Sequence, residues 1–212
     1  MKNIILYGAP AAGKGTQCEL LVERYGYKHI SMGQLFRDLD DSTEFNRMIH
    51  EKISQGILID DETTSQLLKN ALKKLKGEHI VLDGFPRNLN QAKILDEFFE
   101  NYIVINLEVE ERVALERALG RMTCPNCGKI YNIYSREMAP KNEKLCDLCN
   151  IELSGRSDDN EESFKTRFNI YQTNVKNILD YYDQKEVLYI VESCESKEDT
   201  FNIIDKILKE QD

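Results

Sequence analysis

The sequence contains no apolar run long enough to cross a membrane, and the apolar stretch at its start is too short for an export signal. We therefore expect a cytoplasmic protein whose six cysteines stay reduced, available for metal binding or for the core. Positive charge is also scarce, because 28 lysines and arginines face 37 acidic residues and the formal net charge is −9. This excess disfavours a broad nucleic-acid-binding face. Any phosphate site must therefore be a local cluster of Arg, Lys and backbone N–H groups.

Internal repeats and low-complexity linkers are absent, and 212 residues suffice for one α/β domain with a small insertion. Four short apolar runs predict strands, at Asn3–Tyr7, His79–Leu82, Tyr102–Leu107 and Val187–Val191. Six segments with helical periodicity lie between and after them, at Lys14–Arg24, Glu62–Leu75, Leu89–Phe99, Glu110–Leu119, Glu161–Tyr182 and Glu198–Leu208. The alternation predicts a parallel sheet wrapped by helices. Asp61 and Ser196 are expected as helix N-caps, and Ser31-x-x-Gln34 as a capping box.

A glycine-rich loop follows the first predicted strand and opens the first predicted helix. It reads Gly8-Ala9-Pro10-Ala11-Ala12-Gly13-Lys14-Gly15-Thr16, a P-loop variant in which Gly15 stands where Ser or Thr usually follows the lysine. Such a loop points backbone N–H groups at an anion, and Lys14 can reach the β- and γ-phosphates. The glycine spacing does not match the dinucleotide-binding pattern. The motif predicts a nucleoside triphosphate site.

The stretch 122–155 breaks the alternation and holds two C-x2-C motifs with 18 residues between them. This spacing is a strong signal for a closed tetrahedral thiolate site, with Zn²⁺ as the expected metal and iron as an alternative. Four thiolates leave no open coordination position, so the metal should be structural. The predicted ligands are Cys124, Cys127, Cys146 and Cys149.

Several motifs, in the same order along nearly the whole chain, resemble those of adenylate kinases. They are Gly13–Gln17, Asp83-Gly84-Phe85-Pro86-Arg87, Leu119-Gly120-Arg121 and Gly155-Arg156-Ser157-Asp158-Asp159. The resemblance, closest to the bacterial type with a four-cysteine zinc lid, implies transfer of the terminal phosphoryl group of ATP to AMP, giving two ADP. It implies a P-loop core at 1–121 and 156–212 that includes a helical monophosphate-binding segment at 31–60, with 122–155 as the lid. ATP, AMP and ADP would be its partners, with Mg²⁺ bound to ATP and a monomeric enzyme.

Residue roles carried over by this resemblance fall into three groups. The catalytic residues would be Lys14, Arg121, Arg156 and Arg167. The ATP-binding residues would be Ala11, Ala12, Gly13, Lys14, Gly15, Thr16, Arg117, Arg121, Ile130 and Tyr131, with Arg117 against the base. The AMP-binding residues would be Met32, Arg37, Ile57, Leu58, Ile59, Gly84, Phe85, Pro86, Arg87, Gln91, Arg156 and Arg167. Asp83, at the end of a buried strand, suits Mg²⁺ directly or through water.

The chain departs from the usual adenylate kinase pattern in four places. Met32 and Gln34 stand where Thr and Asp are usual, and Ala11 replaces a loop glycine. The stretch Val191-Glu192-Ser193-Cys194 lacks the glycine usually found after that strand. Gln91 favours adenine, because its amide can pair with a base edge. A kinase for CMP, UMP or GMP is the alternative within the class. A P-loop protein with a nucleic-acid-binding zinc ribbon is a distant one.

Overall fold

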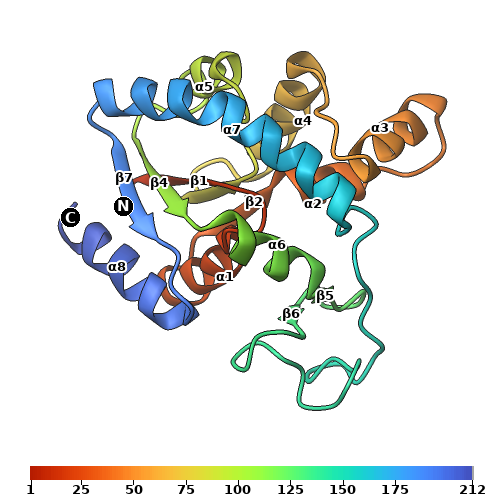
Figure 1. The fold of residues 1–212 in the computed structure, drawn as a ribbon. Helices are drawn as coiled ribbons and strands as arrows, with labels where there is room; N and C mark the ends of the chain where they lie inside the picture. The colour runs from red at the N-terminus through yellow and green to blue at the C-terminus, as the bar shows by residue number, and fades with distance from the viewer. Residues whose placement is uncertain (212) are drawn as a thin grey trace.

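The computed structural model describes residues 1–211, and its centre is a five-stranded parallel sheet in the order β2-β3-β1-β4-β7 (Figure 1). The strands are β1 (Asn3–Gly8), β2 (Lys28–Ser31), β3 (Ile80–Asp83), β4 (Tyr102–Glu108) and β7 (Leu188–Glu192). Four of them were predicted to within a residue at each end. β2 was missed because it is an edge strand in which only Ile30 is buried, so no apolar run reveals it.

Helices cover both faces of the sheet, as the alternation predicts (Figure 1). They are α1 (Lys14–Tyr25), α2 (Met32–Arg37), α3 (Glu44–Ser54), α4 (Asp61–Lys74), α5 (Leu89–Leu95), α6 (Glu111–Leu119), α7 (Glu161–Gln184) and α8 (Lys197–Lys209). α5 ends four residues earlier than expected, because the chain turns there to enter β4. No helix in the described part of the chain is long and apolar enough to cross a membrane.

A hydrophobic core lies on each face of the sheet, and alternate residues of β1 belong to one core or the other. Ile4 and Leu6 pack with residues of α1 and α8, whereas Ile5 and Tyr7 pack with residues of α4, α5 and α7. Burial on both faces explains why the central strands read as nearly unbroken apolar runs. The cores hold the carboxyl ends of the strands at one edge, where a parallel sheet places its ligands.

Helix caps agree with the sequence at some ends and correct it at others. Ser196 caps α8, and Ser31 accepts a hydrogen bond from the N–H of Gln34. The Gln34 side chain does not complete the capping box, because it bonds to Asp38 and Arg37. The prediction of Asp61 as the cap of α4 was wrong, since Asp60 accepts from the Thr63 N–H. The Asp61 carboxylate faces α5 instead, where it accepts hydrogen bonds from the side chains of Asn88, Asn90 and Gln91.

Residues 122–155 project from the body beyond α6 (Figure 1). They form a short antiparallel pair, β5 (Arg121–Thr123) with β6 (Ile130–Asn132), and two single bridges, Thr123 to Ser154 and Leu145 to Glu152. Their own small core consists of Cys124, Tyr131, Cys146 and Leu153. A core of this size is too small to stabilise a fold alone. Residues 31–60 carry α2 and α3.

Candidate active site

The loop between β1 and α1 lines a large cavity at the carboxyl ends of the strands. A Cβ on Gly8 would lie 2.5 Å from the carbonyl oxygen of Leu107, so only glycine fits against β4 there. Ala11 has a left-handed backbone with φ of 58°, the conformation for which glycine is usual. The loop therefore keeps its shape despite the substitution, at the cost of a strained alanine.

Lys14 is held by its own loop. Its Nζ donates to the carbonyl oxygens of Gly8 at 3.0 Å and of Ala9 at 2.7 Å. Burial lowers the pKa of Lys14 to about 8, and the nearby Asp83 carboxylate opposes that shift. An anion placed beside the ammonium would favour the charged form. Above about pH 8, a phosphate group that enters the site would therefore restore the charge of Lys14.

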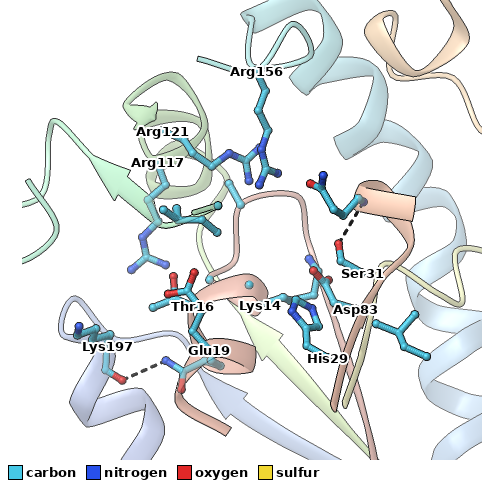
Figure 2. A pocket seen from close by; sticks show the side chains of 18 of the residues that line it. Lys14, Thr16, Glu19, His29, Ser31, Asp83, Arg117, Arg121, Arg156 and Lys197 are labelled. Carbon is cyan, nitrogen blue, oxygen red and sulfur yellow. Dashed lines mark hydrogen bonds between the residues drawn. The ribbon is translucent and has the colours of Figure 1, made fainter. Parts of the chain in front are cut away.

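A cavity of about 660 Å³ lies above this loop and reaches from β2 and α4 to α6 and the lid. Asp83, at the end of β3, lines it together with Lys14 and His29, and Figure 2 shows these three side chains close together at its floor. The predicted triphosphate residues that line it are Ala11, Gly13, Lys14, Gly15, Thr16, Arg117, Arg121, Ile130 and Tyr131. Ala12 is fully buried, so only its backbone is available to a ligand.

A second cavity of about 150 Å³ opens next to the first and is lined by five arginines. Figure 2 shows two of them, Arg121 and Arg156, pointing toward one another over the loop. Lys14 and Asp83 line both cavities, so the loop and the arginine cluster act on one space. Phe85 and Pro86 also line the second cavity. The arginines are Arg37, Arg87, Arg121, Arg156 and Arg167.

Two of these arginines are fixed by buried carboxylates. Nε of Arg121 donates to Asp159 at 2.7 Å, and a second nitrogen completes a bidentate pair. Nη1 of Arg167 donates to Asp158 at 2.7 Å, while Nη2 donates to the carbonyl oxygen of that residue at 2.7 Å. Both carboxylates are less than a tenth exposed. Such paired guanidinium groups are oriented before a substrate arrives.

The other three arginines, Arg37, Arg87 and Arg156, form no ion pair with a carboxylate anywhere in residues 1–211. Burial lowers the pKa of each of these three guanidinium groups. For Arg156 the pKa falls to about 10, because the positive charges of Arg121 and Arg37 add to the effect of burial. Asp158 lies near all three arginines and offsets part of their charge, but no carboxylate pairs with them directly. Converging cations without direct ion-pair partners form a strong receptor for a polyanion. The protein as a whole has a net charge of −9, so this concentration of positive charge is confined to the site.

A third cavity of about 60 Å³ continues from the arginine cluster between α2, α3 and α5. Its lining includes Arg37, Arg87 and Arg167 together with several apolar residues. Of the predicted monophosphate residues, it brings together Met32, Arg37, Ile57, Leu58, Ile59, Gly84, Arg87, Gln91 and Arg167. A lining that combines cations with apolar side chains suits a phosphate joined to a partly apolar group.

Gln91 in this third cavity is already engaged with the protein. It is 2% exposed, its Oε1 accepts the Arg87 N–H at 2.8 Å, and its Nε2 donates to Asp61 at 2.8 Å. A primary amide has two N–H donors and two acceptor lone pairs, so one of each remains for a ligand. Gln91 therefore also positions the backbone beside Arg87, a role the sequence did not reveal.

The lid reaches the loop through two residues of β6. A Cβ on Gly15 would lie 3.2 Å from Cδ1 of Ile130, so the Ile130 side chain lies close to the start of α1. Tyr131 is 2% exposed, and its hydroxyl accepts the N–H of Asp147 at 2.8 Å and lies 3.4 Å from the Cys146 sulfur. Tyr131 thus joins the cysteine cluster to the cavity.

The four lid cysteines meet as their spacing predicts. Their sulfur atoms all lie within 4.8 Å of one another, and those of Cys127 and Cys146 are 3.7 Å apart. Zn–S bonds of about 2.3 Å in a tetrahedron place sulfurs about 3.8 Å apart, so the residues fit Zn²⁺. The hydroxyl of Tyr131 helps to lower the pKa of Cys146 to about 6, against the effect of burial. This favours the thiolate form at Cys146, whereas hydrogen bonds with the neighbouring thiols raise the pKa of Cys127 in the same cluster.

Comparison with known proteins shows the family to which the chain belongs. A profile described as adenylate kinase matches residues 6–187. The chain belongs to the adenylate kinase family. It is 38% identical to an adenylate kinase of Caldanaerobacter subterraneus subsp. tengcongensis, with 97% of this chain and 96% of that protein covered. It is 38% identical to an adenylate kinase of Rickettsia africae, with 97% of this chain and 98% of that protein covered. It is 36% identical to an adenylate kinase of Thermotoga petrophila, with 99% of this chain and 96% of that protein covered.

Family membership confirms the P-loop fold and the nucleoside monophosphate kinase activity between ATP and AMP that the sequence indicated. The individual roles of the site residues in this adenylate kinase family member stay predictions. The sequence left four residues of the site without a role. His29 and Ser193 line the large cavity, and Asp158 and Asp159 orient the arginines. Asp158 and Asp159 lie in the motif Gly155–Asp159, which could have indicated that they belong to the site. His29 lies in no motif, so nothing in the sequence indicated its position in the cavity.

Proposed function

We propose that the enzyme transfers the terminal phosphoryl group of ATP to AMP within the arginine-lined cavity. The observation that supports this proposal is a row of three adjoining cavities. The first lies over the P-loop, the third lies beside Gln91, and the second shares Lys14 with the first and Arg87 with the third. Two nucleotides entering from opposite ends would place their phosphates in the same cluster of cations.

The reaction needs alignment and charge neutralisation more than acid–base chemistry. An α-phosphate oxygen of AMP attacks the γ-phosphorus of ATP, the bond from that phosphorus to the β,γ-bridging oxygen breaks, and ADP leaves. The attacking phosphate is largely dianionic at neutral pH, since its second pKa is about 6. It therefore needs no general base. Holding both anions in line supplies much of the rate acceleration.

Each part of the cluster has a proposed task in this transfer. Arg37 and Arg87, which lack carboxylate partners, hold the α-phosphate of AMP. Lys14 and the loop N–H groups hold the β- and γ-phosphates of ATP. Arg121, Arg156 and Arg167 surround the group in flight, and the guanidinium fork matches its equatorial oxygens.

Two metal ions complete the proposal. Asp83 offers a hard carboxylate oxygen beside Lys14, which suits Mg²⁺ bound directly or through water, and the ion would neutralise charge on the ATP phosphates. Cys124, Cys127, Cys146 and Cys149 would hold a structural Zn²⁺, because four thiolates leave no position for a substrate. A monomeric state and a cytoplasmic location belong to the same proposal.

AMP is the proposed acceptor, in preference to CMP, UMP and GMP. The remaining donor and acceptor of Gln91 support this choice, because a wrong base edge would leave them unsatisfied in a buried place. We expect kcat/KM for AMP to exceed that for each other monophosphate by at least about tenfold, or about 1.4 kcal/mol. Steady-state assays with ATP and each monophosphate test this. A preference for a pyrimidine would refute the assignment.

A further inference from the structure

Ser193 follows β7 directly and joins two parts of the triphosphate site. Its hydroxyl donates to the carbonyl oxygen of Ala12 in the P-loop at 2.9 Å and accepts from Nη1 of Arg117 at 2.7 Å. One side-chain oxygen thus uses both its donor and its acceptor capacity to connect the loop with α6. The backbone of Ser193 is not left-handed, so nothing in its conformation requires glycine.

Arg117 is held on its other side as well. Its Nη2 donates to the carbonyl oxygen of Cys194 at 2.8 Å, and its own carbonyl oxygen accepts from Nδ2 of Asn132 in β6 at 2.9 Å. The hydrogen bonds to Ser193 and Cys194 fix the plane of the Arg117 guanidinium group. Figure 2 shows Arg117 pointing to the side of the cavity where Thr16 and Lys197 lie, away from Arg121 and Arg156.

This placement separates Arg117 from the phosphate cluster. It lines the 660 Å³ cavity but not the arginine-lined one, so it faces the part of a triphosphate nucleotide that lies away from the transferred group. A Cβ on Gly13 would lie 3.5 Å from the Ser193 hydroxyl, which shows how close that oxygen lies to the phosphate loop. A shift of the hydroxyl would move Arg117 relative to the loop.

We propose that Ser193 is a positioning residue for the base of the nucleoside triphosphate, acting by fixing the Arg117 guanidinium relative to the P-loop. The inference rests on the proposed function and on the position of Arg117 against that base, which the resemblance to adenylate kinases implies. Glycine in this place would leave Arg117 with the Cys194 carbonyl alone and the Ala12 carbonyl without this donor. The serine therefore links recognition of the base to the loop that holds the phosphates.

Binding measurements separate this role from a general effect on the loop. Ser193→Ala should weaken ATP binding about three- to tenfold in isothermal titration calorimetry, the range expected for one lost hydrogen bond. Binding of inorganic tripolyphosphate, which has no base, should stay within twofold of wild type. Ser193→Thr keeps the hydroxyl and should bind ATP as wild type does. Thr173→Val is the matched control, because it removes a hydroxyl that donates to a backbone carbonyl on α7, away from the site.

A double-mutant cycle with Arg117→Ala completes the test. If Ser193 acts through Arg117, the alanine at 193 should weaken ATP binding no further once Arg117 is gone. Unchanged ATP affinity in Ser193→Ala, equal losses for ATP and tripolyphosphate, or independent effects in the double variant would each overturn the inference. Turnover of ATP with AMP is scored separately. Absence of turnover in wild type would refute the proposed function, while the binding data would still decide the role of Ser193.

Discussion

The Nζ of Lys14 lies 2.7 Å from the carbonyl oxygen of Ala9, so the loop that should bind phosphate also sets the position of its only lysine. Lys14→Ala keeps the loop backbone and removes the charge. We expect kcat to fall at least about a hundredfold while the fold persists. Steady-state kinetics together with circular dichroism measure both effects. Lys69→Ala, on an exposed part of α4, is the control and should be active; comparable activity in a folded Lys14→Ala variant would contradict the assignment.

The lowered pKa of Lys14 predicts a pH dependence of phosphate binding. In the free enzyme the ammonium loses its proton above about pH 8, whereas a bound polyphosphate keeps it charged. Binding above pH 8 must therefore take up a proton, and affinity should fall as pH rises, by up to about tenfold per pH unit. Calorimetry with inorganic tripolyphosphate between pH 7 and 9.5 measures the slope.

Lys14→Met provides the control for that measurement. It should bind tripolyphosphate weakly and with little change over the same pH range, because the titrating group is gone. Affinity that stays constant for wild type from pH 7 to 9.5, or an equal slope in Lys14→Met, would show that another group governs binding.

Disrupting the cysteine cluster should affect stability more than chemistry. Cys149→Ser should lower the melting temperature and weaken metal retention, yet leave substantial activity at low temperature, because the four sulfurs lie apart from the arginine cluster. Atomic absorption and calorimetric melting measure these effects, and the first also distinguishes zinc from iron. Cys194→Ser, outside the cluster, should retain the metal. A wild-type protein purified without chelator and free of metal would disprove the metal site.

Selectivity for the base should depend on Gln91 more than on Met32. Gln91→Ala should reduce the preference for AMP over GMP, CMP and UMP, whereas Met32→Thr should change AMP affinity only modestly, because a thioether can pack against a purine. Gln91 also holds the backbone N–H of Arg87, so its loss should slow all four monophosphates. The ratios of kcat/KM cancel that common loss. An undiminished AMP preference in Gln91→Ala would assign selectivity to another residue.

The sequence revealed what depends on periodicity and motif spacing. The four buried strands and six of the helices were predictable because apolar residues repeat along them, whereas α3 was not predicted. The meeting of the four cysteines was predictable because their spacing is typical of a metal site. β2 was not, since an edge strand buries only one side chain of four. Long-range partners were also hidden: nothing near Asp61 indicates that it bonds to Gln91, nor near Ser193 that it bonds to Arg117. Such contacts depend on how the elements pack, which local sequence does not encode.

The most direct test of the account is the stoichiometry of the reaction. Purified enzyme is incubated with Mg²⁺, ATP and AMP, and ³¹P nuclear magnetic resonance follows ATP, ADP and inorganic phosphate together. Transfer within the arginine cluster predicts two ADP formed for each ATP consumed, equal consumption of AMP, and no phosphate released. One ADP and one phosphate for each ATP, with AMP unchanged, would mean that water is the acceptor and would contradict the account.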